Sequence, residues 1–176
     1  MTLNDPTDVL PYVRALRMML GGYGAYSREK RRETDVAVRE EISRCAMRAR
    51  NHLANVHDNA YRDGNTNVAR ACKLAMEDID ALRNDVDHAE TGGEHSRFSR
   101  HSKINKKTQN QLIKHDHDTL QMVSKAVNVS NELEDAHTKG EEAEACIQLA
   151  RSTQQLVSSC RGHFSERRAV LKRLGA

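Results

Sequence analysis

The stretch that decides the fold is residues 68–86, VARACKLAMEDIDALRNDV, because its apolar side chains recur at intervals of four and three residues. This spacing places one apolar side chain in each turn of an α-helix and gathers them on one stripe. The stripe consists of Val68, Cys72, Ala75, Ile79, Leu82 and Val86. A narrow stripe of this kind is typical of a seam between antiparallel helices, so we predict that the segment packs against the helix before it.

That preceding helix is predicted from Ser27, as N-cap, to about Arg62, and its apolar residues follow the same spacing. They are Val38, Ile42, Cys45, Ala49, Leu53, Val56 and Ala60. Asp63-Gly64-Asn65 is a predicted turn between the two helices, because Gly and Asn favour turn conformations. The two segments therefore form a predicted helical hairpin.

An additional short helix is predicted at the front of the chain, in residues 5–26, DPTDVLPYVRALRMMLGGYGAY. Its stripe consists of Val9, Val13, Leu16 and Leu20, with Thr7 as the expected N-cap. Pro11 falls in the first turn, where its missing N–H would have no helical partner, and Gly21-Gly22 ends the helix. Residues 1–90 are thus expected to form a three-helix unit.

The second half of the chain repeats the hairpin pattern after a Gly-, Ser- and Lys-rich stretch at residues 91–109, which we interpret as a linker. One stripe is Leu112 or Ile113, Leu120, Val123, Val127 and Leu133, and the other is Cys146, Ala150, Thr153, Val157, Cys160, Phe164, Leu171 and Leu174. Gly140 breaks the pattern between them. The predicted fold is all-α: an N-terminal three-helix bundle, a basic linker, and an antiparallel, coiled-coil-like hairpin at residues 110–176 that protrudes as an arm.

Composition predicts a thin core, because 30% of the residues are charged and only 3% are aromatic. Ala, Cys, Thr and Val dominate the stripes, which allows close helix packing or leaves room for a guest between the helices. The four cysteines form no CxxC pair and are expected to be free and buried. No run of 18 apolar residues occurs, so no membrane span is predicted.

Two clusters have the residue types of metal sites. His115 to Asp118 reads HDHD, but His115 and His117 would point about 160° apart on a helix, so we expect a solvated polar face there. Glu134 and His137 form an ExxH pair, for which the sequence offers no complete set of partner ligands. We therefore predict no metal site.

RNHLANVH, residues 50–57, resembles the Arg–Asn…His signature of the HEPN-type RNases, in which an arginine and a histidine act on an RNA phosphodiester. Arg50 and His57 are seven residues apart and would share a helix face. The surrounding residues also form an ordinary amphipathic helix, and we favour that interpretation and predict no enzymatic activity.

The linker carries five cations, Arg97, Arg100, Lys103, Lys106 and Lys107, against Glu94 alone. A stretch of this kind is either a solvated hinge or a contact to RNA phosphates or an acidic protein. Phe98 is its only aromatic residue, so base stacking is not expected.

VLPYVRALR, residues 9–17, resembles the signature of the LYR-motif family of small mitochondrial helical proteins, above all its complex I accessory-subunit type. MRAR at residues 47–50 and ARACKLAMEDIDAL at residues 69–82 add to the resemblance, which covers about residues 7–90, whereas Pro11 and Val13 depart from the motif. The resemblance implies an adaptor on the matrix side of mitochondria that binds the acidic acyl carrier protein. It also implies that the acyl-phosphopantetheine chain of that carrier protein lies inside the helical core.

The residues of this region independently suit an acidic partner, because cations outnumber the single anion, Glu29, between residues 9 and 32. The cations are Arg14, Arg17, Arg28, Lys30, Arg31 and Arg32. Tyr12 and Leu16 are expected at the packing interface with that partner. The predicted function is an accessory or scaffold subunit of a respiratory complex or mitochondrial ribosome, with no cofactor of its own. The alternatives are a cytoplasmic coiled-coil interaction module of the vesicle or cytoskeletal kind, and a HEPN-like RNase using Arg50 and His57.

Overall fold

The computed structural model describes residues 9–27, 29–89 and 106–174, and all regular structure in these ranges is α-helical. The helices are α1 (Leu10–Met19), α2 (Arg31–Arg62), α3 (Thr66–Asp87), α4 (Lys106–Thr138) and α5 (Ala143–Leu174). The predicted all-α class is confirmed. None of the described helices is long and apolar enough to cross a membrane.

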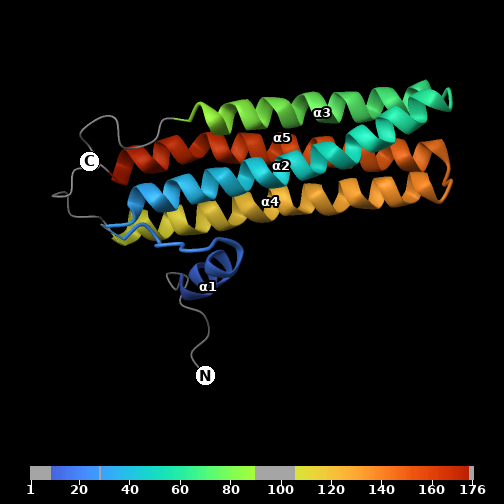
Figure 1. Cartoon of the computed structure of the whole chain (residues 1–176). Coiled ribbons are helices and arrows are strands. Elements are labelled where there is room, and N and C mark those ends of the chain that lie inside the picture. Colours follow the sequence, from blue (N-terminus) through green and yellow to red (C-terminus); the bar gives the residue numbers. More distant parts are fainter. Residues whose placement is uncertain (1–8, 28, 90–105, 175–176) are drawn as a thin grey trace.

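The four long helices lie side by side in one bundle, and consecutive helices run in opposite directions (Figure 1). α2 packs on α3 and on α4, and α5 packs on the same two helices, so α2 and α5 occupy opposite corners. The predicted separate three-helix unit and protruding hairpin are therefore not what forms. Each hairpin has an apolar seam that would stay exposed alone, and joining the two hairpins buries both seams in one core.

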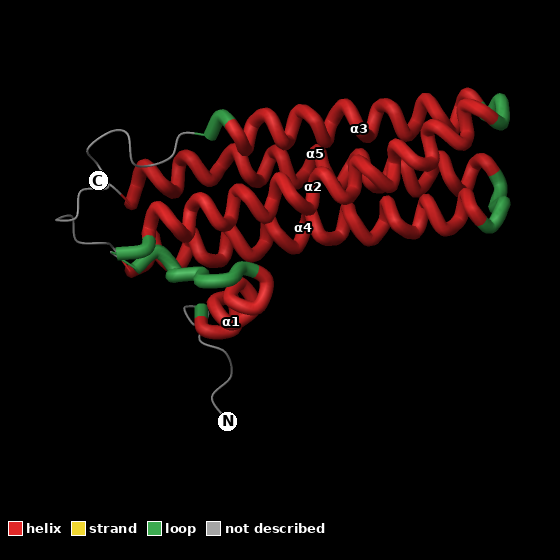
Figure 2. The backbone as a smooth tube through the Cα atoms, in the orientation of Figure 1, coloured by secondary structure: helices red, strands yellow, loops and turns green. Residues whose placement is uncertain are grey.

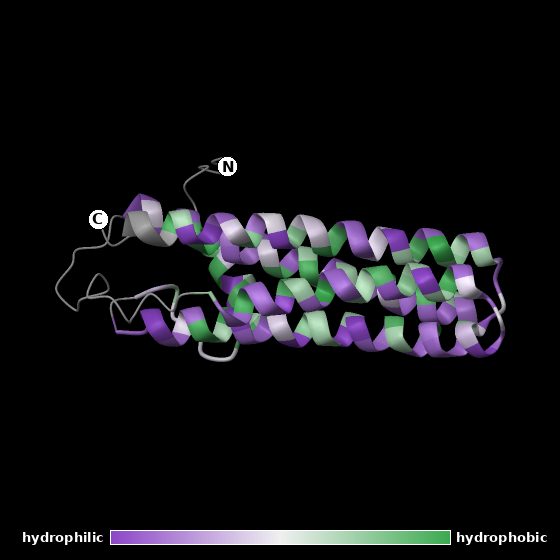
Figure 3. Cartoon of the chain, turned by 90° about the horizontal axis from the view of Figure 1, so that it is seen from above, coloured by the Kyte–Doolittle hydropathy of each residue, from purple (hydrophilic) through white to green (hydrophobic). Residues whose placement is uncertain are grey.

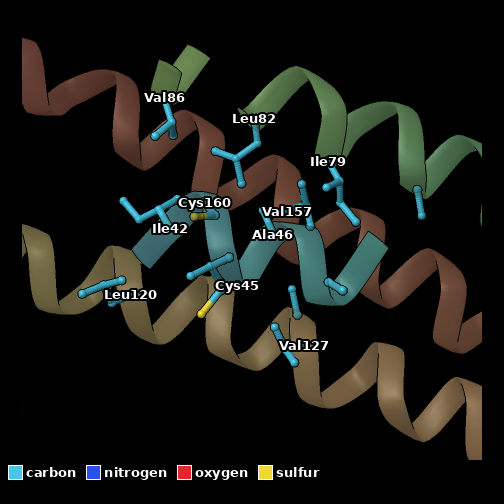
Figure 4. Close-up of a cluster of buried hydrophobic side chains, with 14 of the residues drawn as sticks. Ile42, Cys45, Ala46, Ile79, Leu82, Val86, Leu120, Val127, Val157 and Cys160 are labelled. Atoms are coloured by element: carbon cyan, nitrogen blue, oxygen red, sulfur yellow. The ribbon is translucent and has the colours of Figure 1, made fainter. Parts of the chain in front are cut away.

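The predicted apolar stripes of α2, α3 and α4 are buried, and so is the stripe of α5 from Cys146 to Phe164. Figure 4 shows side chains from all four helices meeting in the interior, among them Ile42, Ile79, Leu120 and Val157. Hydrophilic and hydrophobic residues alternate along each helix, as expected for helices with one buried side (Figure 3). The side chains of Leu171 and Leu174 lie outside the described residues.

The two tight connections form where the sequence predicts them. Asn65 caps α3 by accepting a hydrogen bond from the Val68 N–H, and the preceding Gly64 has a φ of +78°. Gly140 has a φ of +74° between α4 and α5. These left-handed conformations cost glycine little, because it has no Cβ to clash with the backbone.

Two predicted boundaries are wrong. α2 begins at Arg31 with Lys30 as its N-cap, not at Ser27, because residues 20–27 continue along the end of the bundle (Figure 2). α4 begins at Lys106, so the last four residues of the predicted linker are helical, and Thr108 is buried. The rest of the linker, residues 91–105 with Arg97, Arg100 and Lys103, lies outside the described residues.

The short helix α1 lies against the side of the bundle, next to α4 and near the end where α2 begins (Figure 1). Pro11 occupies the first turn and Gly22, with a φ of +78°, follows the helix end, as predicted. Thr7, the expected N-cap, lies outside the described residues. Val13, Leu16 and Leu20 face the bundle and are buried.

Candidate functional site

The outward side of α1 carries the clearest charged surface of the N-terminal region. Val13 and Leu16 occupy the inner side of the helix, and this leaves Arg14 and Arg17 exposed on the outer side. Lys30 and Arg32, at the start of α2, are exposed at the same end of the bundle. We call these four residues the cationic face. Arg28, predicted to belong to it, lies outside the described residues.

Apolar side chains lie beside the arginines on α1. Leu10 is 61% exposed and Met18 is 89% exposed, and both stand within one helical turn of Arg14. Contiguous exposed apolar surface is typical of sites that meet another molecule. The outer side of α1 is thus both cationic and apolar.

Three residues predicted to bind a partner instead hold the chain together. Tyr12 is half-buried and meets the His117 ring edge-on, with 4.9 Å between the ring centroids. Leu16 is fully buried, and Arg31 is only 7% exposed. The prediction that Leu16 and Arg31 contact a partner is therefore wrong for the folded chain, because both side chains are covered by its own residues.

A buried polar network lies at the end of the bundle next to α1, centred on Arg167 of α5, which is 3% exposed. Its Nε donates to Asp116 Oδ1 of α4 over 2.9 Å, and its NH1 group donates to Asp35 Oδ1 of α2. The Tyr26 hydroxyl donates to Asp116 Oδ2 and accepts a hydrogen bond from the NH2 group of Arg167. The network therefore joins three bundle helices to the segment that follows α1.

The charges of the network are close to balanced. Arg39 lies 3.2 Å from Asp35 Oδ2, so two guanidinium groups face the two carboxylates. Burial raises the pKa of Asp116 above its ordinary value, and the charge of Arg167 opposes this effect. Burial also raises the pKa of Tyr26, so its hydroxyl keeps the proton it donates.

The backbone that delivers Tyr26 is held in an uncommon conformation. Ala25 and Tyr26 have φ values of +48° and +57°, a left-handed region that costs a non-glycine residue about 1–3 kcal/mol. The surrounding chain holds them there: Gln109 Nε2 donates to the Ala25 carbonyl over 2.7 Å, and the Gly24 N–H donates to Thr34 Oγ1 over 3.1 Å. The position of Tyr26 is therefore determined by tertiary contacts.

The predicted solvated face at residues 115–118 is wrong for its first two members. Asp116 is fully buried, and His115 is 7% exposed. His115 Nε2 lies 2.7 Å from the His163 carbonyl oxygen, and the two imidazole rings stack with 4.1 Å between centroids. Burial lowers the pKa of His115 to about 4.

The sequence carries a signal for the network. The predicted stripes skip one turn between Leu112 and Leu120 and another between Phe164 and Leu171. Asp116 and Arg167 occupy these gaps at helical spacing, so they face the core. Oppositely charged residues in the gaps of two stripes indicate a buried ion pair, provided that the two gaps meet in space.

Arg50 and His57 do lie on one face, as predicted for an RNase. Both line a surface depression of about 360 Å³ between α2 and α3. Arg50, however, donates from Nε to Asp80 Oδ1 over 2.8 Å, and His57 Nδ1 lies 2.9 Å from Asp58 Oδ1. One nitrogen of each side chain is thus paired with a carboxylate of the chain itself.

Glu134, the first residue of the ExxH pair, has a structural role. Glu134 accepts from Asn55 Nδ2 over 2.7 Å and lies 2.5 Å from His52 Nδ1, which ties α4 to α2. The four cysteines are free and buried, as predicted. Within the described ranges, no group of three or more His, Cys, Asp or Glu side chains is arranged to hold a metal ion.

Comparison of the chain with protein-family models, with curated proteins and with solved structures gives no match.

Proposed function

We propose that the chain is a non-enzymatic helical scaffold that docks an acidic protein through the cationic face of α1 and the start of α2. The observation that carries this proposal is the exposure of Arg14 and Arg17 on α1, where Arg17 Nε donates to the Tyr23 carbonyl over 3.4 Å. α1 contains no acidic residue, so no anion of its own helix neutralises them. Guanidinium groups suit carboxylates because their planar donors match carboxylate geometry, and a cationic face accelerates encounter with an anionic partner.

The exposed Leu10 and Met18 support a protein partner over a free anion. An interface of ordinary size needs apolar side chains at its centre and charges at its rim. Leu10, Arg14 and Met18 supply both on one side of a helix that α4 holds in place.

The acyl carrier protein is the partner we propose to test first, with a mitochondrial assembly as the setting, because residues 9–17 resemble the LYR motif. The proposed contact is the acidic surface of the carrier protein. We do not place its acyl chain inside the bundle, because small core residues such as Ala46, Ala49 and Ala75 are fully buried by neighbouring side chains. Close helix packing accounts for these small residues.

The test is binding of acyl carrier protein to the full chain, measured by calorimetry or interferometry. Reversing both arginines, Arg14→Glu with Arg17→Glu, should weaken binding by about tenfold or more, because charge pairs at an interface become repulsive. The matched control is Arg70→Glu with Arg151→Glu, two exposed arginines on α3 and α5 with the same change in net charge. Circular dichroism should show equal helicity in both variants.

Equal loss of binding in the two variants would show that net charge, and not the cationic face, attracts the carrier protein. If carrier protein does not bind, affinity capture from cells followed by mass spectrometry decides whether any acidic protein depends on Arg14 and Arg17.

The two alternatives have direct tests. A coiled-coil module needs a free apolar seam, whereas the described seams of α2 to α5 are buried within the bundle. Concentration-dependent association of the chain in light scattering would support the coiled-coil alternative. An RNase requires cleavage of RNA that His57→Ala abolishes.

A further inference from the structure

We propose that the N-terminal arm, residues 9–27, is a releasable lid on the side of the four-helix bundle, against α4 and near the end where α2 begins, and that Tyr26 is the latch that holds it closed. In the closed state the arm lies against the bundle near the start of α2 (Figure 2), and its Tyr26 hydroxyl is hydrogen-bonded to Asp116 and Arg167 of the buried network. In the open state the arm leaves while α2 to α5 stay folded.

The bundle does not need the arm to satisfy its buried charges. Asp35, Asp116 and Arg167 belong to α2, α4 and α5, and Arg167 binds both carboxylates directly. Only the Tyr26 hydroxyl comes from the arm. When Tyr26 withdraws, each carboxylate keeps its guanidinium partner, and solvent can replace the phenol at Asp116 Oδ2. The ion pairs therefore tie the helices together independently of the lid.

The arm is built to open as one unit. α1 has ten residues and packs chiefly against α4, and a helix of this length is not stable in water without tertiary contacts. The segment after it is anchored by the buried rings of Tyr23 and Tyr26, which meet edge-to-face with 6.2 Å between centroids. Loss of the anchor therefore releases the segment, and α1 unfolds in the same step.

Two features of the closed arm favour release. Ala25 and Tyr26 hold left-handed backbone conformations that a free chain would abandon. In the described part of the chain, the buried Tyr23 hydroxyl has no hydrogen-bond partner, and it would regain water on opening. The hydrogen bonds of Tyr26, the burial of both rings and the burial of Val13, Leu16 and Leu20 oppose these terms and keep the arm closed.

The lid also bears on docking, a consequence that rests on the proposed function. Arg14 and Arg17 share one outward side only while α1 is helical, so the closed arm is the form that presents the cationic face. The experiment below uses no partner, and its outcome is independent of whether an acidic protein binds.

The experiment is amide hydrogen exchange on the full chain, comparing Tyr26→Phe with the wild type. The matched control is Tyr61→Phe, the same chemical change at a ring that is 68% exposed on α2. Tyr26→Phe should accelerate exchange at the amides of Leu20, Gly24 and Ser27 by roughly tenfold to a hundredfold, the effect of losing a hydrogen bond to a charged group. Amides in the middle of α3 should keep their wild-type rates, and Tyr61→Phe should change neither region.

Two outcomes would overturn the proposal: unchanged exchange in the arm of Tyr26→Phe, or acceleration of α3 by the same factor as the arm. If Tyr26→Phe does not fold, Gln109→Ala replaces it, because this change removes the bond to the Ala25 carbonyl and leaves the ion pairs intact. The arm should then exchange faster than wild type, while α3 is unaffected. If the amides of the arm exchange only through global unfolding, in the wild type and in Gln109→Ala alike, the arm is not a lid.

Discussion

Arg167 on α5 donates a hydrogen bond to Asp116 on α4 over 2.9 Å, and the two side chains are 3% and 0% exposed. Burying two charges removes their hydration, and this cost is offset only where each charge finds further partners. Asp35 and Tyr26 supply those partners, so the pair specifies how α2, α4, α5 and the arm align.

Replacing Arg167 by methionine should lower the free energy of unfolding by about 3–5 kcal/mol, because it leaves two buried carboxylates without their shared cation. The control is Arg161→Met on the same helix, where the ion pair with Asp85 is solvent-exposed and its loss should cost less than about 1 kcal/mol. Urea unfolding followed by circular dichroism measures both. Similar losses in the two variants would mean that the buried network contributes little to stability.

Acidification should destabilise the fold through His115. Its pKa in the folded chain is about 4, below the ordinary 6.5. Between these values the unfolded chain holds a proton that the native chain lacks, so the free energy of unfolding falls as the pH falls, by up to about 3 kcal/mol. His115→Gln should lose less stability than wild type between pH 7 and 4.

Asp116 changes the free energy of unfolding in the opposite direction. Its pKa is raised in the folded chain, so between the unfolded and the folded pKa the native chain holds a proton that the unfolded chain lacks, and stability rises as the pH falls. This contribution is present in wild type and in His115→Gln, so the difference between their unfolding curves isolates the histidine. Parallel pH dependences would contradict the assignment.

A methyl group at Gly24 should destabilise the arm. A Cβ built there would lie 2.5 Å from Lys30 Cβ, an atom next to the backbone that cannot swing away, and 3.0 Å from Thr34 Oγ1. Gly24→Ala should therefore cost about 1–3 kcal/mol, as overpacking typically does. Gly21→Ala is the control, since a Cβ at Gly21 meets nothing within 4 Å. Thermal unfolding should separate the two variants, and equal melting temperatures would show that the Gly24 contact is not tight.

Enlarging a core alanine tests whether the bundle has room for a guest. Ala49 is fully buried on α2, so Ala49→Leu should overpack the interior and cost about 1–3 kcal/mol. Ala169→Leu, at an exposed position of α5, should be almost neutral. A stable, well-folded Ala49→Leu variant would indicate spare volume in the core. It would then support the hypothesis that an acyl chain binds inside the bundle.

The native thiols should resist alkylation. All four cysteines are buried, and burial raises the pKa of Cys72 and of Cys160 to about 12, so little thiolate exists at neutral pH. The chain is treated with a maleimide and the adducts are counted by intact mass. None of the four cysteines should be labelled in buffer, and all four should be labelled in denaturant. Ser158→Cys, at an exposed position of α5, supplies a thiol that should react at once. Rapid labelling of native cysteines would mean that the bundle opens more readily than its packing implies.

Much of the fold could be predicted from the residues alone, because helical periodicity is a local property. The stripe of Val68, Cys72 and Ala75 identifies a buried helix side without reference to any other segment. Gly64 and Gly140 mark turns for an equally local reason, since glycine tolerates a positive φ. The exposure of Arg14 and Arg17 follows from the same periodicity in α1.

The packing of the two hairpins against each other, and everything built at their junction, was decided by tertiary structure. A stripe shows that a helix needs a partner but not which partner, so a separate unit and arm matched the pattern as well as a single bundle did. Asp116 and Arg167 could not be paired from sequence because they are 51 residues apart and each resembles a surface residue by itself. The cost of burying each charge is offset only where the other charge, Asp35 and Tyr26 lie next to it. The tertiary structure alone brings these four residues together.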